Sequence, residues 1–319
     1  MLYSGIAIPH INIKREIGIK EMDIGLRKSS FNMSLSMTML FLVIIPSLSF
    51  SPTDSRAESH TWQKLAEGLY LGEFDPKIKS KICNHKIVIL KIDPKFYTFK
   101  LLCASEHDRK PRTAREWCKE FGLLAAINAS MYQNMDPIKS TGYMKNYEHL
   151  NNSHINPAFG AFLCFNPVDS SLPEVQIIDR RLQKKWKGII KRYNTVVQDY
   201  RMISNGEKRG WPQQEEIYGS AAIAMDKDNH VLFILSRSPF STHDLIHILL
   251  SLPVHIENAI YLEGGPEATL YSKIGDKEMT LVGMCKTDFT EQDDNESLHA
   301  IPNVIGVVKR RGGLDAGGN

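Results

Sequence analysis

The sequence predicts an α/β fold in which helices pack on a mixed sheet, and three observations support this. Hydrophobic residues make up 42% and charged residues 24% of the 319 positions, an ordinary globular composition that allows a sizeable core. In each half of the chain an amphipathic helix that starts at a capping box leads into a short apolar run. In the second half an apolar run also precedes the helix, so strand, helix and strand form a βαβ unit.

The first half begins with two predicted strands, residues 86–92 and 96–102. Residues 93–95 separate them with an Asp-Pro-Lys turn, so we expect a hairpin. A helix is predicted over residues 113–121, because apolar side chains recur there at i, i+3, i+4 and i+7. The apolar run 123–127 then predicts a strand that is buried on both faces.

The middle of the chain gives weaker signals. Residues 134–157 are polar and rich in Asn, Pro and Gly, which predicts a long loop, and long loops in compact domains are usually functional. Strands are predicted at residues 158–165 and 175–178. We interpret the basic segment 180–192 as a solvated, partly helical stretch rather than a nucleic-acid-binding patch.

The second half repeats this order more clearly. Residues 220–225 and 231–235 are predicted strands on either side of a hairpin turn at 226–230. Residues 241–252 form a predicted helix with a stripe of Leu and Ile, and 259–262 is the next strand. A right-handed parallel crossover would place the carboxyl ends of the strands before and after this helix at one edge of the sheet.

An N-terminal segment differs from the rest in composition. Residues 33–50 carry no charge, and their densely apolar part is shorter than the roughly 20 residues of a transmembrane helix. A basic pair at 27–28 precedes it, and Ser55 and Ala57 supply small side chains at the two positions that a signal peptidase reads, so we expect cleavage before Glu58. The protein is therefore expected to be exported, to the periplasm or outside the cell. A buried core helix or an uncleaved anchor is the alternative.

These features divide the chain into three parts: an upstream extension with a signal peptide at 1–57, one domain at 58–311, and a Gly-rich, disordered tail at 312–319. Lys and Arg number 39 and Asp and Glu 36, so the net charge of +3 gives no reason to expect a nucleic-acid partner. We expect membrane contact only through the signal segment, if it stays uncleaved.

The cysteines and one histidine pair are considered as ligands or cross-links. The five cysteines have no zinc-type spacing, so buried free thiols are favoured, although Cys83 and Cys103 would bracket the first hairpin and could form a disulfide. His243 and His247 have a spacing that can bind a metal ion on a helix. They point away from the apolar stripe and lack an H-E-x-x-H glutamate, so a solvated face is favoured. We expect no metal and no cofactor.

Polar and glycine residues follow two of the predicted buried strands. The segment NASMY, residues 128–132, follows the first, and Glu263-Gly264-Gly265 follows the second. In open α/β sheets, ligands bind outside the carboxyl ends of strands. Paired glycines also let the backbone approach a ligand closely, and Glu263 would be presented to that ligand. A simple turn is the alternative for the glycine pair.

These two segments resemble signatures of the phosphodiester glycosidase family. INASMY at 127–132 resembles the family's INAGMY or INGGFF, and AIYLEGG at 259–265 resembles its AlyLDGG. Residues 194–207 and 220–253 are similar to the family's intervening strand and strand–strand–helix regions, so the resemblance spans roughly residues 83–309 and implies a domain of this family. The chain departs from the usual Gly at Ser130, from Asp at Glu263, and from Arg-Thr or Asn-Gly at Ser220-Ala221.

The resemblance implies hydrolysis of a sugar-1-phosphate diester, between the anomeric carbon and the phosphate oxygen, in envelope or extracellular glycans. Glu263 would activate water or stabilise positive charge at the anomeric carbon, and Asn128 would hydrogen-bond the substrate. Arg201 and Arg237 are the candidates for holding phosphate, with surface ion pairs as the alternative. The other candidate substrate-binding residues are Tyr132, Gln198, Ser236, Gly264 and Gly265.

Two other functions are compatible with these residues. A non-catalytic envelope protein would bind glycan or sugar phosphate in the same cleft without turnover. A structural envelope protein would have no ligand at all. The substitution Glu263→Gln distinguishes the three, because it should abolish turnover and spare binding only in an enzyme.

Overall fold

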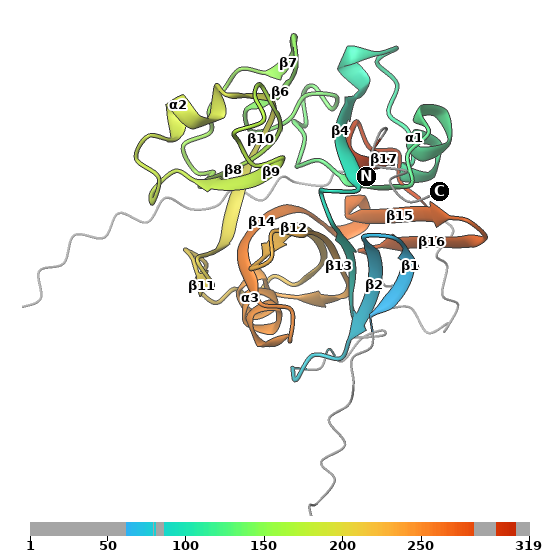
Figure 1. Ribbon diagram of the computed structural model, residues 1–319. Coiled ribbons are helices and arrows are strands. Elements are labelled where there is room, and N and C mark those ends of the chain that lie inside the picture. Colours follow the sequence, from blue (N-terminus) through green and yellow to red (C-terminus); the bar gives the residue numbers. More distant parts are fainter. Residues whose placement is uncertain (1–61, 79, 81–85, 284–297, 311–319) are drawn as a thin grey trace, which may run out of the picture. The chain divides into compact units, whose positions relative to one another are not determined.

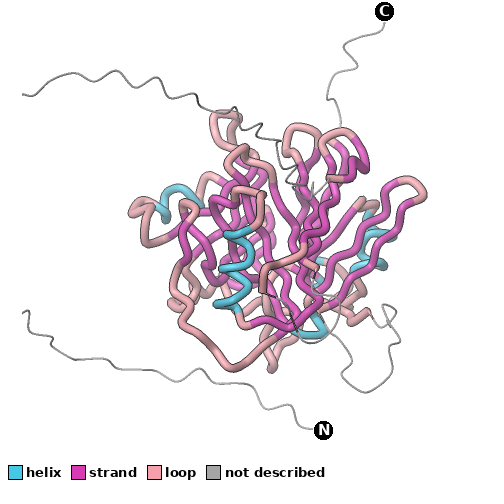
Figure 2. The backbone as a smooth tube through the Cα atoms, turned by 90° about the horizontal axis from the view of Figure 1, so that it is seen from below, coloured by secondary structure: helices cyan, strands magenta, loops and turns pink. Residues whose placement is uncertain are grey.

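The computed structural model describes residues 62–78, 80, 86–283 and 298–310, all within one compact unit, Arg56–Asn319. Strands dominate this part, and few helices accompany them (Figure 2). The predicted signal peptide, its cleavage site and the predicted tail lie outside the described residues. None of the helices in the described part is long and apolar enough to cross a bilayer.

The described strands form two sheets, and the larger contains 12 of them (Figure 1). Its main order is β1-β2-β3-β13-β12-β14-β10-β6-β7, while β8 and β11 also pair with β10, and β9 pairs with β8. The long strand β10 therefore connects the group β6 to β9 with the rest of the sheet. The strands are β1 (Gln63–Ala66), β2 (Leu69–Phe74), β3 (Ile87–Ile92), β6 (Met144–Asn146), β7 (His149–Asn152), β8 (Ala161–Pro167), β9 (Val175–Asp179), β10 (Tyr193–Ser204), β11 (Glu207–Lys208), β12 (Tyr218–Asp226), β13 (Val231–Phe240) and β14 (Ile256–Gly264).

The smaller sheet has the order β16-β15-β5-β17-β4 among the described residues. Its last strand in the sequence, β17, lies between β4 and β5 and pairs with both. The middle of this sheet is therefore completed by a segment far along the chain. The strands are β4 (Tyr97–Cys103), β5 (Ala125–Asn128), β15 (Thr269–Ile274), β16 (Lys277–Val282) and β17 (Asn303–Lys309).

The two longer helices begin where their caps predict. Thr113 and Glu116 form the predicted capping box: the Thr113 hydroxyl accepts from the Glu116 N–H at 3.2 Å, and the Glu116 carboxylate accepts from the Thr113 N–H at 2.8 Å. Gly122, at φ 65°, ends that helix. Ser241 caps the other helix by accepting from the Asp244 N–H at 3.1 Å. The helices are α1 (Ala114–Phe121), α2 (Trp186–Ile190), α3 (Thr242–Ser251), and the short 3-10 turns η1 (Ala104–Glu106) and η2 (Gly265–Glu267).

The predicted mixed sheet is wrong in its strand directions, because every strand pair in the described residues is antiparallel. The fold is mostly antiparallel sheet. β13, α3 and β14 do follow one another, but β12 lies between the two strands and pairs antiparallel with each. β13 and β14 therefore run parallel without being neighbours. Ser236 and Gly264 are level, since Ser220 of β12 pairs with both, but β13 continues to Phe240 and so ends beyond the end of β14.

The predicted hairpin of residues 86–102 is also wrong. Both strands form, and so does the turn, in which the Phe96 N–H donates to the Asp93 carbonyl at 3.1 Å. However, β2 and β13 occupy the two edges of β3, so β4 pairs with β17 in the other sheet. The suggested disulfide loses its basis, because Cys103 is a buried free thiol and Cys83 lies outside the described residues.

The predicted loop 134–157 contains a short hairpin, β6 with β7. β7 was not predicted because its buried side chains are polar: Asn151 accepts from the Ser140 N–H and donates to the Ile138 carbonyl, both at 2.8 Å. β6 is only three residues long and contributes one buried apolar side chain, Met144, to the core. In the basic segment 180–192 only α2 is helical.

The inner faces of the two sheets pack on one another. Phe99 of β4 contacts Phe233 and Phe165 of the larger sheet edge-to-face, with ring centroids 6.2 and 6.3 Å apart, in an apolar cluster that draws on both sheets. α3 covers the outer face of the larger sheet with its predicted stripe of Leu and Ile. α1 covers the outer face of the smaller sheet with Trp117. The core therefore has three layers: one between the two sheets, one between α3 and the larger sheet, and one between α1 and the smaller sheet.

Candidate functional site

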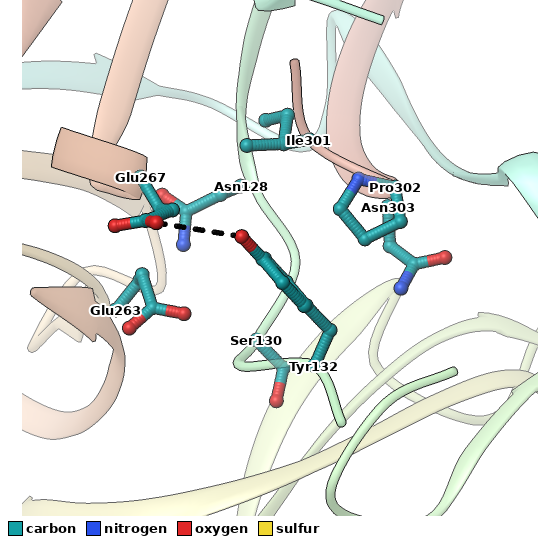
Figure 3. A pocket seen from close by; sticks show the side chains of 8 residues that line it. All are labelled: Asn128, Ser130, Tyr132, Glu263, Glu267, Ile301, Pro302 and Asn303. Atoms are coloured by element: carbon teal, nitrogen blue, oxygen red, sulfur yellow. Dashed lines mark hydrogen bonds between the residues drawn. The ribbon is translucent and has the colours of Figure 1, made fainter. Parts of the chain in front are cut away.

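Three stretches of chain line a pocket: the end of β5 with the residues after it, the end of β14 with η2, and the start of β17 (Figure 3). Tyr132 donates across the pocket from its hydroxyl to the Glu267 carboxylate at 3.5 Å. The structure thus brings together three of the predicted site residues. The lining residues are Asn128, Ser130, Tyr132, Glu263, Glu267, Ile301, Pro302 and Asn303.

Hydrogen bonds connect these stretches behind the pocket. The Ala129 N–H donates to the Asn303 carbonyl at 3.0 Å, which joins the segment after β5 to the start of β17. The Thr269 N–H donates to Asn128 Oδ1 at 3.2 Å, which joins β5 to the chain after η2. Asn128 therefore has its carbonyl oxygen occupied by the fold and its amide nitrogen left for the pocket.

Glu263 comes from an irregular strand end. It pairs with Ala221 of β12, whereas Ala222 pairs with Tyr261, so Leu262 is an extra residue that forms a β-bulge. Bulges re-aim neighbouring side chains and are frequent beside active sites. Burial raises the pKa of Glu263 to about 8, and the charge of Glu267 adds to this, while the Gly264 N–H, which donates to the carboxylate at 3.0 Å, opposes it. Glu263 is therefore largely neutral at pH 7.

Glycines allow the backbone around Glu263 to pack closely. A Cβ on Gly219 would lie 2.2 Å from the Gly283 carbonyl oxygen, and one on Gly264 would lie 2.3 Å from the Tyr261 hydroxyl. Gly265 has φ 73°, a conformation that L side chains rarely adopt. The Glu-Gly-Gly segment is thus a place where three backbone stretches meet, and glycine is required there sterically.

Buried polar atoms without partners gather at this pocket. Asn128 Nδ2, Ser130 Oγ and both amide atoms of Asn303 form no hydrogen bond in the described structure, although the three side chains are at most 3% exposed. An unpaired buried polar group costs about 1–3 kcal/mol, so such atoms usually await a ligand or water. Their convergence on one pocket makes it the candidate ligand site of the described structure.

A further carboxyl lies behind the pocket. Asp199 of β10 is 0% exposed; one of its oxygens accepts from the Tyr200 N–H at 2.8 Å, and Oδ2 has no partner among the described residues. Burial raises the pKa of Asp199 well above its usual range, and the charge of Glu263 adds to this. The Ser130 hydroxyl and the Tyr200 N–H partly offset the shift. Asp199 is therefore harder to ionise than an ordinary aspartate.

Six predicted site residues are not among those that line the pocket, and two of them, Gly264 and Gly265, directly follow Glu263 in the chain. Arg201 donates from Nη1 to both Asp179 oxygens at 2.9 Å in a buried ion pair, so its charge is used within the fold. Gln198 is buried and hydrogen-bonds backbone groups of the 143–159 segment. Ser236 is level with Gly264 across the sheet but donates to the Ser238 carbonyl at 2.9 Å, and Arg237 follows it on β13.

Sequence reasoning missed Glu267, Asp199 and Asn303 as site residues. Glu267 stands four residues after Glu263, so the glycine motif could have indicated it. Asp199 lies between two residues that were selected, and a lone acid within a strand of otherwise apolar and polar residues is its signal. Nothing in the pattern around Asn303 indicates a site, because only the pairing of β17 with β5 brings it there.

Potential metal ligands were examined across the described residues. Asp226, Asp228 and His230 place one ligand atom each within 4.8 Å of one another. Asp226 Oδ1 already accepts from the N–H groups of the other two, both at 2.9 Å, so this carboxylate builds the hairpin turn. The rings of His243 and His247 lie 4.6 Å apart on α3, and His243 contacts Asp244.

Comparison with known proteins adds a family and a fold. A family model described as phosphodiester glycosidase matches residues 121–308. No curated protein matches the sequence.

Two solved structures share the fold. A hypothetical protein from Synechocystis is similar with a TM-score of 0.56 at 12% identity, and the match covers 77% of this chain and 63% of that one, less than two thirds of its length. The catalytic domain of zebrafish N-acetylglucosamine-1-phosphodiester alpha-N-acetylglucosaminidase, auto-inhibited by its pro-peptide, is similar with a TM-score of 0.52 at 13% identity, over 77% of this chain and 85% of that one. At these identities the likeness concerns the fold.

Proposed function

We propose that this chain, which belongs to the phosphodiester glycosidase family, hydrolyses a glycosyl phosphodiester in envelope or extracellular glycans. The observation that carries the proposal is the convergence of Asn128, Ser130 and Asn303, each with unpaired polar atoms, around two carboxyl side chains in one pocket. Sugars and phosphates offer many hydrogen-bonding groups, and paired carboxyls suit acid–base chemistry at an anomeric carbon.

The two carboxyls take different roles in this proposal. Glu263, neutral at pH 7, donates a hydrogen bond or its proton to the oxygen that links phosphate to the sugar. Glu267, which already accepts from Tyr132, takes the proton of the attacking water. The bond from the anomeric carbon to the phosphate oxygen breaks, water supplies the new hydroxyl, and the phosphate monoester leaves. A phosphate is a good leaving group, so modest assistance suffices.

The unpaired amides provide the binding groups. Asn128 Nδ2 donates to a sugar hydroxyl or phosphate oxygen, and the Asn303 amide can both donate and accept. The ring of Tyr132 supplies an apolar face on which a sugar can stack. None of the described lining residues is Lys or Arg, so the donors that they offer to phosphate are neutral.

The test is turnover of an aryl-phosphate diester of N-acetylglucosamine, the sugar named for the zebrafish relative. We expect the purified protein to release free sugar and aryl phosphate, and Glu263→Gln to lower kcat about 100-fold or more. Glu148→Gln is the matched control, because Glu148 is exposed on the β6–β7 turn. Absence of turnover by the unmodified protein, with sugar phosphate still bound, would favour a non-catalytic glycan-binding protein instead.

Export is a second part of the proposal. The uncharged, apolar segment 33–50 after a basic pair supports a signal peptide that is cleaved before Glu58. Expression in a bacterial host followed by mass determination of the product outside the cytoplasm tests it. A mature chain beginning at Glu58 is expected, whereas a full-length product confined to the cytoplasm would contradict export.

A further inference from the structure

Ser130 adopts a backbone conformation that serine rarely takes. Its φ is 103°, in the region that favours glycine, and it follows directly on the strand that ends at Asn128. Strained positions cluster at functional sites, and here the conformation places a hydroxyl that is 3% exposed at the pocket wall. That hydroxyl makes no well-formed hydrogen bond in the described structure, and the group it influences within the fold is the Asp199 carboxyl.

Asp199 is a buried carboxyl whose pKa the Ser130 hydroxyl lowers, against the effect of burial. Ser130 is close enough to the Asp199 carboxyl to influence its pKa, and in Figure 3 its oxygen points away from the hydrogen bond between Tyr132 and Glu267. Asp199 Oδ2 and Ser130 Oγ are each without a partner among the described residues. A neutral carboxyl offers one O–H donor, and a serine hydroxyl can accept that bond while donating its own proton elsewhere.

The cation of the same strand is not available to this pair. Arg201 stands two residues after Asp199 but is held by both oxygens of Asp179, with Ser204 as a further partner of that carboxylate. The pocket's described lining also contains no Lys or Arg. Among the described lining residues, the groups that can donate to a phosphate oxygen are neutral.

We propose that Asp199 and Ser130 form a hydrogen-bond relay in which the buried carboxyl donates to Ser130 Oγ and the Ser130 hydroxyl donates to an anionic phosphate oxygen of the bound substrate. This rests on the proposed function, because it assigns the phosphate subsite of the same pocket. Ser130 touches the ligand, and Asp199 is a positioning residue that acts through it. Consecutive hydrogen bonds polarise one another, so the relay strengthens a neutral donor in a pocket whose described lining residues carry no positive charge.

The test compares two ligands by titration calorimetry at pH 7, N-acetylglucosamine 1-phosphate and N-acetylglucosamine. Ser130→Ala should weaken binding of the phosphate-bearing ligand about 10-fold and leave the plain sugar unaffected, since a hydrogen bond to a charged group is lost. Asp199→Ala should show the same selective loss. Asp199→Asn should restore it, because an amide accepts from the Tyr200 N–H and donates to Ser130 as the neutral carboxyl does.

Ser130→Gly supplies a readout that a merely structural role would not give. Glycine relieves the positive φ, so this variant should unfold at higher denaturant than the unmodified protein and yet bind N-acetylglucosamine 1-phosphate about 10-fold more weakly. Equal weakening of both ligands by these variants, or an Asp199→Asn variant as weak as Asp199→Ala, would overturn the relay. Failure of every form to bind the phosphate ligand would overturn it as well.

These outcomes are distinguishable from failure of the proposed hydrolase. If the protein binds the phosphate ligand with the expected selectivity but never turns over the aryl-phosphate diester, the relay is supported and the proposed hydrolase activity is refuted. If the protein turns the diester over, but the Ser130 and Asp199 variants weaken binding of the phosphate ligand and of the plain sugar equally, the hydrolase activity is supported and the relay is refuted.

Discussion

Replacing Glu263 by Gln should make the stability of the fold less sensitive to pH. The pKa of this carboxyl is about 8 in the folded protein, against an ordinary value of 4.5. Between those values the folded state binds more protons than the unfolded chain, so the free energy of unfolding falls as the pH rises and levels off above about pH 8. Glutamine takes no part in this titration.

The size of the effect follows from the shift. The difference between 4.5 and about 8, at 1.36 kcal/mol for each pKa unit, sets an upper bound of about 5 kcal/mol. The Glu263 side chain is partly exposed, so screening by water reduces this, and we expect about 2–3 kcal/mol between about pH 5 and pH 8.

Urea denaturation at a series of pH values measures this directly. The unmodified protein should lose about 2–3 kcal/mol more than Glu263→Gln over that range, whereas Glu148→Gln should follow the unmodified protein because its side chain is exposed. The other titrating groups are common to all three proteins and cancel in the comparison. Parallel curves for the unmodified protein and Glu263→Gln would refute the raised pKa of Glu263.

Three further substitutions test how the site is held. Arg201→Met should lower the free energy of unfolding by about 3–5 kcal/mol, since it leaves Asp179 buried without its partner, and adding Asp179→Asn should recover part of the loss; an unchanged urea midpoint would return Arg201 to the list of ligand-binding candidates. Gly219→Ala should lower the melting temperature, because its Cβ would meet the Gly283 carbonyl oxygen at 2.2 Å, whereas Gly188→Ala, with nothing within 4 Å, should not; equal melting of both would contradict the close packing. Thr113→Ala should cost about 1 kcal/mol in chemical denaturation through loss of the helix cap, and no loss would mean the cap contributes little.

Local sequence patterns predicted the helices and strands better than they predicted which strands pair with one another. The capping box of α1 and the stripe of α3 depend on neighbouring residues, and both helices form where expected. Strand pairing depends on segments far apart in sequence. The turn at Asp93 forms, yet β3 and β4 enter different sheets because other strands fill the edges of β3. The single strand β12 between β13 and β14 likewise turns an expected mixed sheet into an antiparallel one.

The site divides in the same way. Asn128, Tyr132 and Glu263 follow buried strands with small or glycine neighbours, a local signal that sequence inspection can find, and the three meet in one pocket. Arg201 was selected for its charge, but charge alone does not reveal that Asp179 is its partner. Asn303 becomes a lining residue only through the position of β17, which no local pattern encodes.

The position of β17 has a consequence for the order of assembly during translation. β4 and β5 emerge from the ribosome long before β17. Until β17 is synthesised, each has an unpaired edge at which another chain can pair. When residues 303–309 emerge, β17 fills the gap between β4 and β5. The hydrogen bond from the Ala129 N–H to the Asn303 carbonyl then completes the pocket wall. A nascent chain that ends before Asn303 therefore lacks both the central strand of the smaller sheet and one wall of the pocket.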